Sequence, residues 1–339
     1  MRRSLRACSA GVAAVLANWS CGPAPAAEAA PVPAYAPARP ICQVTDDRLA
    51  EASGLAVDPD QMFMVNDGGT SVQVYVLDTD CQVDEVIEAP VDPYDVEDLA
   101  RASDGTLWLA DIGDNEGSRD TVALHTLDAD GTAALFRMTY PDGAHDAEAL
   151  LLDPAGQPYL VTKDVFGDSG VYTPAGPLSP DEPTTLRRVG SVNLQPTGTG
   201  GGPSGALGQL LVTGAAMSPD GRLAVIRTYT DAYLYAVPDG DLSAALTEPP
   251  TRIALPPSRQ GEAIAFAPNG RDLLLTSEGL PFEVTLLPAG PGPVPAGAAS
   301  AGRSDVAGSL LLPAAGVGIL GCLVGLGALV VHARKRRAG

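Results

Sequence analysis

Two apolar runs separated by a tight turn make up the stretch SGLAVDPDQMFMV, Ser53–Val65. Residues 54–57 and 62–65 are rich in strand-forming apolar side chains, whereas Asp-Pro-Asp-Gln at residues 58–61 favours a reverse turn. The stretch therefore predicts two β-strands joined by a short turn.

The same strand–turn–strand pattern recurs along the chain. Its turns are Asp58-Pro59-Asp60-Gln61, Ala102-Ser103-Asp104-Gly105, Asp153-Pro154-Ala155-Gly156, Ser218-Pro219-Asp220-Gly221 and Ala267-Pro268-Asn269-Gly270. The last positions of successive turns are 44, 51, 65 and 49 residues apart. A repeat of this length is typical of the blades of a β-propeller, which are stabilised by stacking on their neighbours.

The predicted domain, residues 41–287, is all-β: a β-propeller of five or six blades. The 65-residue interval contains the glycine-rich stretch Gly198–Gly205 and is long enough to hold a sixth blade. A β-sandwich is the alternative all-β fold. The last unit lacks an outer strand, and we expect Pro40–Val44 to supply it, because an open ring would leave exposed strand edges.

Cysteine usage indicates an oxidising compartment. Only Cys42 and Cys81 lie within the predicted domain. Two cysteines in a secreted domain most simply form one disulfide, which here would join the closing segment to the first blade. A pair of free thiols is the alternative.

Both ends of the chain have the composition of targeting segments. Residues 1–29 combine an arginine-rich start, a short apolar run and small residues in an Ala-x-Ala pattern, which predicts a secretory signal peptide. Residues 306–332 include 22 uncharged residues from Leu310 to Val331, enough to span a bilayer. The basic residues of 333–339 favour a cytoplasmic tail. We therefore expect a single-pass protein of the cell membrane with its bulk outside the cell.

Two linkers flank the domain, an Ala/Pro-rich one at residues 30–40 and a Pro/Ala/Gly stalk at residues 288–305. The motif Leu312-Pro313-Ala314-Ala315-Gly316 resembles the cell-wall sorting signal of sortase substrates. Alanine at 315 replaces the threonine whose peptide bond is cut, so wall attachment is less favoured than a retained membrane span.

Charge and histidine content exclude some functions. The chain has 41 Asp and Glu against 21 Lys and Arg, a net charge of −20, which argues against nucleic acid as a partner. It has three histidines, too few for a His-rich zinc or copper site.

Acidic residues recur in the loops that a propeller brings to one mouth of its channel. The candidate metal ligands are Asp67, Glu97, Asp111, Asp114, Glu148, Glu262 and Glu278. Carboxylates grouped near one axis raise one another's pKa unless a cation lies between them, and oxygen ligands suit Ca²⁺ better than zinc. Lys163 and Arg227 reach the same mouth, where they could hold an anionic substrate, and His145 is a candidate general base. The alternative is that these are turn-forming residues and solvated ion pairs.

Several stretches resemble secreted actinobacterial β-propeller proteins of the phytase-like (esterase-like) kind. They are Ser53–Ala56, Val65–Gly69, Val96–Ala100, Asp111–Asn115, Tyr140–Ala149, Arg227–Tyr233 and Gln260–Ile264. The resemblance covers nearly all of residues 42–280 and implies a propeller with an acidic, Ca²⁺-compatible mouth. β-Propeller phytases use several Ca²⁺ ions at such a mouth to bind and hydrolyse phosphate esters.

We expect this mouth to bind an extracellular ligand, such as an anionic small molecule, or a partner without catalysis. The alternative is a Ca²⁺-dependent hydrolase of phosphate or carboxylate esters, in which Glu97, Glu148 and Glu262 hold the metal while Lys163 and Arg227 hold the anion. A third possibility is a structural metal that only closes the ring.

Overall fold

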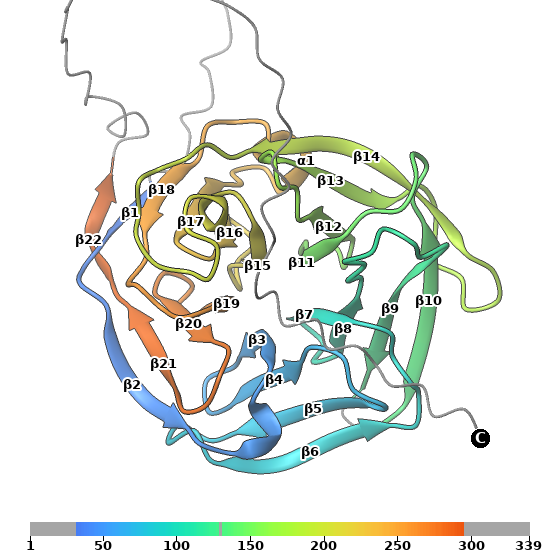
Figure 1. The fold of residues 1–339 in the computed structure, drawn as a ribbon, viewed down its shortest axis with the longest axis horizontal. Helices are drawn as coiled ribbons and strands as arrows, with labels where there is room; N and C mark the ends of the chain where they lie inside the picture. Colours follow the sequence, from blue (N-terminus) through green and yellow to red (C-terminus); the bar gives the residue numbers. More distant parts are fainter. Residues whose placement is uncertain (1–31, 129–130, 295–339) are drawn as a thin grey trace, which may run out of the picture. The chain divides into compact units, whose positions relative to one another are not determined.

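The computed structural model describes residues 32–128 and 131–294. Within them, β-sheets are arranged in a ring around a central axis (Figure 1). No helix of these residues is long and apolar enough to cross a membrane. The predicted signal peptide, residues 1–29, and the predicted span, residues 306–332, lie outside the described residues.

The ring has five blades of four antiparallel strands each, with the first strand innermost, and a short parallel pairing of the outer strands of blades 2 and 3 joins these two blades into one eight-stranded sheet (Figure 1). Blade 1 contains β3 (Ala52–Val57), β4 (Met62–Asn66), β5 (Val72–Leu77) and β6 (Val83–Ala89), and blade 2 contains β7 (Val96–Arg101), β8 (Leu107–Asp111), β9 (Val122–Leu127) and β10 (Ala133–Thr139). Blade 3 contains β11 (Ala147–Leu152), β12 (Pro158–Thr162), β13 (Asp168–Pro174) and β14 (Thr184–Asn193), and blade 4 contains β15 (Val212–Met217), β16 (Leu223–Thr228), β17 (Asp231–Ala236) and β18 (Thr251–Ala254). Blade 5 contains β19 (Gly261–Phe266), β20 (Leu273–Ser277), β21 (Phe282–Leu287) and, from the start of the domain, β2 (Arg39–Val44).

The β-propeller prediction is confirmed, with five blades among the described residues. The glycine-rich stretch at residues 198–205 does not belong to a sixth blade. It lies in the loop between β14 and β15, which also holds the 3-10 helix η2 (Leu207–Gln209). Two further short helices, η1 (Asp47–Leu49) and α1 (Leu242–Ala245), lie in connections.

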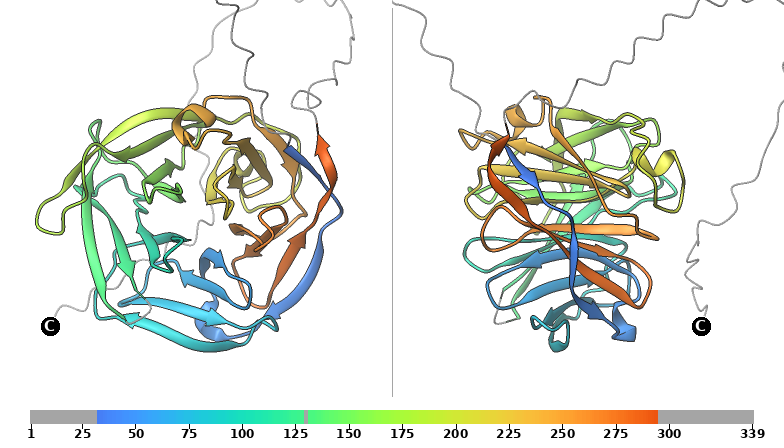
Figure 2. Two further views of the ribbon diagram at one scale, coloured as in Figure 1. Left: turned by 180° about the vertical axis from the view of Figure 1, so that it is seen from behind. Right: turned by 90° about the vertical axis from the view of Figure 1, so that its left-hand side faces the viewer.

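The first strands of the domain complete its last sheets. β2 pairs antiparallel with β21, so the predicted closure of the ring is confirmed. The predicted disulfide is also present: Cys42 of β2 is bonded to Cys81, in the turn between β5 and β6, with 5.7 Å between their Cα atoms. β1 (Val32–Tyr35) pairs with β22 (Ala289–Val294) at the edge of the ring (Figure 2). Backbone pairing therefore extends into the segments that we assigned to the linker and the stalk.

Apolar side chains form five cores, one between each pair of neighbouring blades. For example, Leu150 and Leu160 of blade 3 pack with Ala110 and Leu124 of blade 2. Each blade therefore buries its apolar surface against its neighbours and has little core of its own, as in other repeat folds. The ring holds the ends of the five inner strands at fixed positions around the axis.

Candidate functional site

Each inner strand has a β-bulge near its start, where the pairing with the second strand shifts register. A bulge turns a side chain away from the regular alternation of a strand. The equivalent positions at these bulges hold Ser53, Glu97, Glu148, Thr213 and Glu262, and all five residues are buried. Three of the five blades therefore place a buried glutamate at the same height near the axis.

The two hydroxyl residues of this set join neighbouring blades. Ser53 Oγ donates to the backbone oxygen of Glu97 at 2.6 Å, and Thr213 Oγ1 donates to that of Glu262 at 3.0 Å. The backbones that carry two of the glutamates are thus fixed by side chains of the preceding blades.

Asp67, Asp95 and Glu97 form an acidic trio at one end of the axis, the mouth. One ligand oxygen of each lies within 4.8 Å of the others. Asp67 follows β4, Asp95 precedes β7, and Glu97 is the bulge residue of β7. Gly113 covers the trio, because a Cβ atom at this position would overlap the carboxylates of Glu97 and Asp95. Two segments of the chain and a glycine therefore converge on one group of carboxylates.

Burial and mutual repulsion raise the pKa values in the trio. Desolvation, followed by the hydrogen bond and the charge of Asp67, raises the pKa of Asp95 to about 8. Desolvation and the charges of Glu148 and Asp67 raise the pKa of Glu97 well above its usual range. The charge of Lys163 opposes the shift of Glu97. A bound cation would favour the ionised carboxylates in the same way.

Lys163 lies among the glutamates of the mouth. Its Nζ donates to Glu148 Oε1 at 2.5 Å and lies 5.4 Å from the centre of the Tyr229 ring. Burial raises the pKa of Glu148 to about 7, although Lys163 opposes this shift. The charge of Lys163 also lowers the pKa of Glu262, which burial raises. Of the sequence candidates, the structure therefore brings together Asp67, Glu97, Glu148, Glu262 and Lys163.

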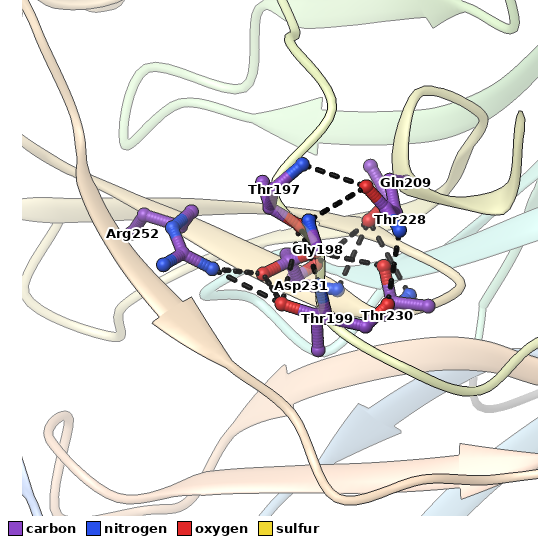
Figure 3. A network of polar contacts seen from close by, with 8 residues as sticks. All are labelled: Thr197, Gly198, Thr199, Gln209, Thr228, Thr230, Asp231 and Arg252. Atoms are coloured by element: carbon purple, nitrogen blue, oxygen red, sulfur yellow. Dashed lines mark hydrogen bonds and ion pairs between the residues drawn. The ribbon is translucent and has the colours of Figure 1, made fainter. Parts of the chain in front are cut away.

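A glycine-rich loop packs against Tyr229, the residue beside Lys163. A Cβ atom at Gly202, which has a φ of +72°, would lie 2.9 Å from Cβ of Tyr229, so glycine permits the close approach. The loop is held by Asp231, which is fully buried and accepts hydrogen bonds from Thr197, Thr199, Thr230 and Arg252 (Figure 3). Asp231 thus positions the loop that packs against Tyr229, the residue beside Lys163.

Asp111, a predicted ligand, is engaged elsewhere. It accepts hydrogen bonds from the amides of Tyr94 and Asp95 and from Arg119, and it contacts His125 at 3.1 Å. Burial opposes its ionisation, but His125, Arg119 and the amides lower its pKa to about 2. Asp111 therefore holds the segment that presents Asp95.

The two remaining predicted ligands, Asp114 and Glu278, lie in different places. Asp114 accepts hydrogen bonds from the amides of Ser118 and Arg119, so it orders its own loop. Glu278 lies near the mouth, where its charge raises the pKa values of Asp67 and Glu262.

His145 lies in a separate cluster over blade 3. Its Nε2 is 3.1 Å from Asp142 Oδ1 and 3.1 Å from the Tyr172 hydroxyl. The Tyr140 ring packs edge-on against both His145 and Tyr172. None of these contacts involves the acidic trio.

Arg227 is almost fully buried and bridges two blades. Its Nη1 donates to the backbone oxygens of Ala263 in β19 and Thr276 in β20. Its charge opposes the raised pKa of Glu262, and it is one of the residues that line a cavity beside the connection between blades 4 and 5.

Asp95 was not among the ligands predicted from the sequence, and Asp98 was assigned no role. Asp95 stands two residues before Glu97, and this proximity was the available signal. Asp98 is fully buried, and its carboxylate accepts hydrogen bonds from the amides of Leu99, Leu150 and Ala215. It therefore ties together the inner strands of blades 2, 3 and 4, and nothing in its local sequence indicates this contact.

The opposite end of the axis differs in chemistry. A cavity of 550 Å³ there is lined by the ends of the inner strands and by the repeated turns, with apolar residues such as Leu55, Leu99, Met217 and Phe266. None of the buried acids described above lines this cavity.

The chain is thus a five-bladed β-propeller with an acidic mouth. No protein family and no curated protein matches it. Among solved structures, a putative gluconolactonase is 16% identical over 76% of this chain and 94% of its own, with a TM-score of 0.44. A gluconolactonase from Xanthomonas campestris is 18% identical over 70% of this chain and 73% of its own, with a TM-score of 0.42. The soluble aldose sugar dehydrogenase from Escherichia coli, in its apo form, is 12% identical over 75% of this chain and 99% of its own, with a TM-score of 0.42.

Sequence identities of 12% to 18% with TM-scores of 0.42 to 0.44 say nothing about the activity of this chain. The β-propeller assignment rests on the strands described above, and these structures do not support the phytase-like part of the sequence resemblance.

Proposed function

We propose that this protein is a ligand-binding β-propeller that holds a divalent cation, Ca²⁺ in the first place, at the acidic trio. The observation that carries the proposal is the convergence of Asp67, Asp95 and Glu97, whose ligand oxygens lie within 4.8 Å of one another. The three residues come from two blades of a rigid ring, so the fold brings together charges that repel one another.

The donor set fits Ca²⁺. Carboxylate oxygens are hard ligands, and Ca²⁺ takes about 6–8 of them in flexible geometry. Three carboxylates leave coordination positions for water and for an oxygen of an anionic ligand. Lys163 lies on the same mouth and adds a positive charge, which favours an anion over a neutral ligand.

We also propose that the domain is displayed outside the cell, tethered by residues 306–332. The disulfide between Cys42 and Cys81 supports an oxidising compartment. The composition of the two ends supports secretion and a single span.

A second candidate function is hydrolysis of phosphate or carboxylate esters. The observation that favours it is Glu148, whose pKa of about 7 suits an acid or base near neutral pH. Its carboxyl group is hydrogen-bonded to Lys163, which can orient an anionic substrate. When bound, the cation would polarise the ester group.

The test is a thermal melt of residues 30–305, first freed of metal and then titrated with Ca²⁺. A ligand of the native state raises the melting temperature by mass action. We expect a saturable rise that is lost in Glu97→Gln and retained in Glu85→Gln, which makes the same change on an exposed outer strand. The absence of a rise in the unmodified protein would rule out the cation site. A screen of phosphate and carboxylate esters with Glu148→Gln then separates binding from hydrolysis.

A further inference from the structure

The cavity at the end of the axis opposite to the acidic trio has the size of a small-molecule site. Its volume of 550 Å³ lies within the range of about 300–1,000 Å³ that is usual for ligand pockets. Along β7, Glu97 lies at the mouth, Asp98 is fully buried, and Leu99 lines the cavity. Asp98 accepts hydrogen bonds from the amides of Leu150 and Ala215, which joins three inner strands between the two ends. The cavity is therefore separate from the mouth.

Apolar side chains that are open to solvent form part of the cavity wall. Val57 and Met217 are partly exposed, and the exposed prolines Pro154 and Pro219 lie at the rim. Pro154, in the turn of blade 3, packs on Gly221 in the turn of blade 4, where a Cβ atom would overlap it. Contact between neighbouring turns gives the rim a defined shape, and such preorganisation favours the binding of a rigid apolar group.

The rim of the cavity carries negative charge. Asp104 and Asp153 line it, and both stand in turns between a first and a second strand. The amide of Thr106 lowers the pKa of Asp104, so this carboxylate stays charged at neutral pH. Arg101 also lines the cavity, but Asp58 lies 3.7 Å from its guanidinium and offsets its charge. The charge that remains at the rim is negative and favours a cation.

The two turns do not need the charge of these aspartates. Oδ1 of Asp153 accepts hydrogen bonds from two backbone amides that follow it, and Oδ1 of Asp104 accepts one. In the equivalent turn of blade 5, the side-chain oxygen of Asn269 accepts two such hydrogen bonds. An amide oxygen therefore suffices for the turn, and the negative charge is available to a ligand.

We propose that this cavity binds a small apolar molecule that carries one positive charge, such as a protonated amine. The apolar part lies against Val57, Met217 and the prolines of the rim, and the ammonium group lies beside Asp104 and Asp153. Exposed ion pairs contribute little, so apolar burial supplies most of the affinity and the carboxylates supply selectivity for a cation. The site needs no metal and does not depend on the cation proposed for the acidic trio.

The experiment measures the binding of naphthylmethylamine to residues 30–305, which include every described strand, by isothermal titration calorimetry. The protein is freed of metal on a chelating resin, and the amine is protonated at neutral pH. Naphthylmethanol and naphthoate carry a neutral and a negative group on the same rings. We expect saturable binding of the amine, about tenfold weaker binding of the alcohol, and still weaker binding of naphthoate.

Two substitutions remove the charges of the rim but keep an oxygen for each turn. Asp104→Asn and Asp153→Asn should each weaken binding of the amine about threefold and leave binding of the alcohol unchanged, because only a charge is lost. The matched control is Asp220→Asn, the same change in the turn of blade 4, at a residue outside the cavity lining. It should leave binding of the amine unchanged in about 0.15 M salt, where charges are screened beyond about 8 Å.

The amine could instead bind at the acidic trio, and Glu97→Gln distinguishes the two places. This variant should bind the amine as the wild type does, and a loss in this variant alone would overturn the proposal. So would a lack of saturable binding, or binding of the alcohol or naphthoate as tight as that of the amine. Equal losses in Asp220→Asn and the two rim variants would also overturn it, since they would reveal only a general charge effect. Because the protein is free of metal, these results are separate from the outcome of the Ca²⁺ titration.

Discussion

Replacing Glu97 by glutamine should change the stability of the domain in opposite directions without and with Ca²⁺. Glu97 is buried within 4.8 Å of Asp67 and Asp95. At an effective dielectric constant near 20, two unit charges at that distance repel by about 3 kcal/mol. Protonation of a buried glutamate at pH 7 relieves this repulsion but costs a similar amount, because about three pH units separate neutrality from its usual pKa. The neutral side chain of glutamine removes both the repulsion between carboxylates and the cost of protonating one of them.

We therefore expect Glu97→Gln to be more stable than the wild type without metal, by at most about 3 kcal/mol. With Ca²⁺ at a hundred times its dissociation constant, the wild type should gain about 2.7 kcal/mol, and the variant should gain little. The assay is urea unfolding, followed by circular dichroism, with and without Ca²⁺. Glu85→Gln should match the wild type in both conditions. A Glu97→Gln protein that is destabilised in both conditions, or one that keeps the full Ca²⁺ response, would refute the reasoning.

Three further predictions concern pH, a glycine and the disulfide. In metal-free protein, the pKa values of Asp95 and Glu148 are raised to about 8 and about 7, so the folded state binds more protons than the unfolded state. The free energy of unfolding, measured in urea, should therefore fall as the pH rises from about 5 to 8. An increase over that range would contradict these assignments. Gly113→Ala places a methyl group against the trio and should weaken Ca²⁺ binding measured by calorimetry, whereas Gly176→Ala, which points into open space, should not. Reduction of the disulfide, which spans 39 residues, should lower the unfolding free energy by about 4 kcal/mol in denaturant titrations, and a loss below about 1 kcal/mol would show that the unfolded chain is not constrained by it.

The repeated turns predicted the architecture because they depend on local chemistry. Asp-Pro and Asp-Gly sequences specify a turn wherever they occur, and the apolar runs beside them specify strands. The closing strand was predictable from what the last unit lacked. The number of blades could not be predicted, because a glycine-rich loop and an extra blade occupy similar lengths of chain.

The candidate site was predicted in part. Glu97, Glu148 and Glu262 were found because they stand at equivalent positions of the repeat. Asp111 was assigned to the metal although His125 and Arg119 engage it, and these partners are set by the packing of β8 on β9. Contacts of this kind depend on tertiary structure and leave no mark in the local spacing of residues.

β1 and β2 pair with strands from the other end of the domain, so the ring can close only after those strands have been made. The strand that finishes the last blade is among the first to be synthesised, so it has no partner until nearly all of the domain has been made. A chain released early would expose an unpaired strand edge and half of the core shared by blades 1 and 5. Chains that end before β21 are thus exposed to aggregation or proteolysis, and only chains that extend through β21 can close the ring.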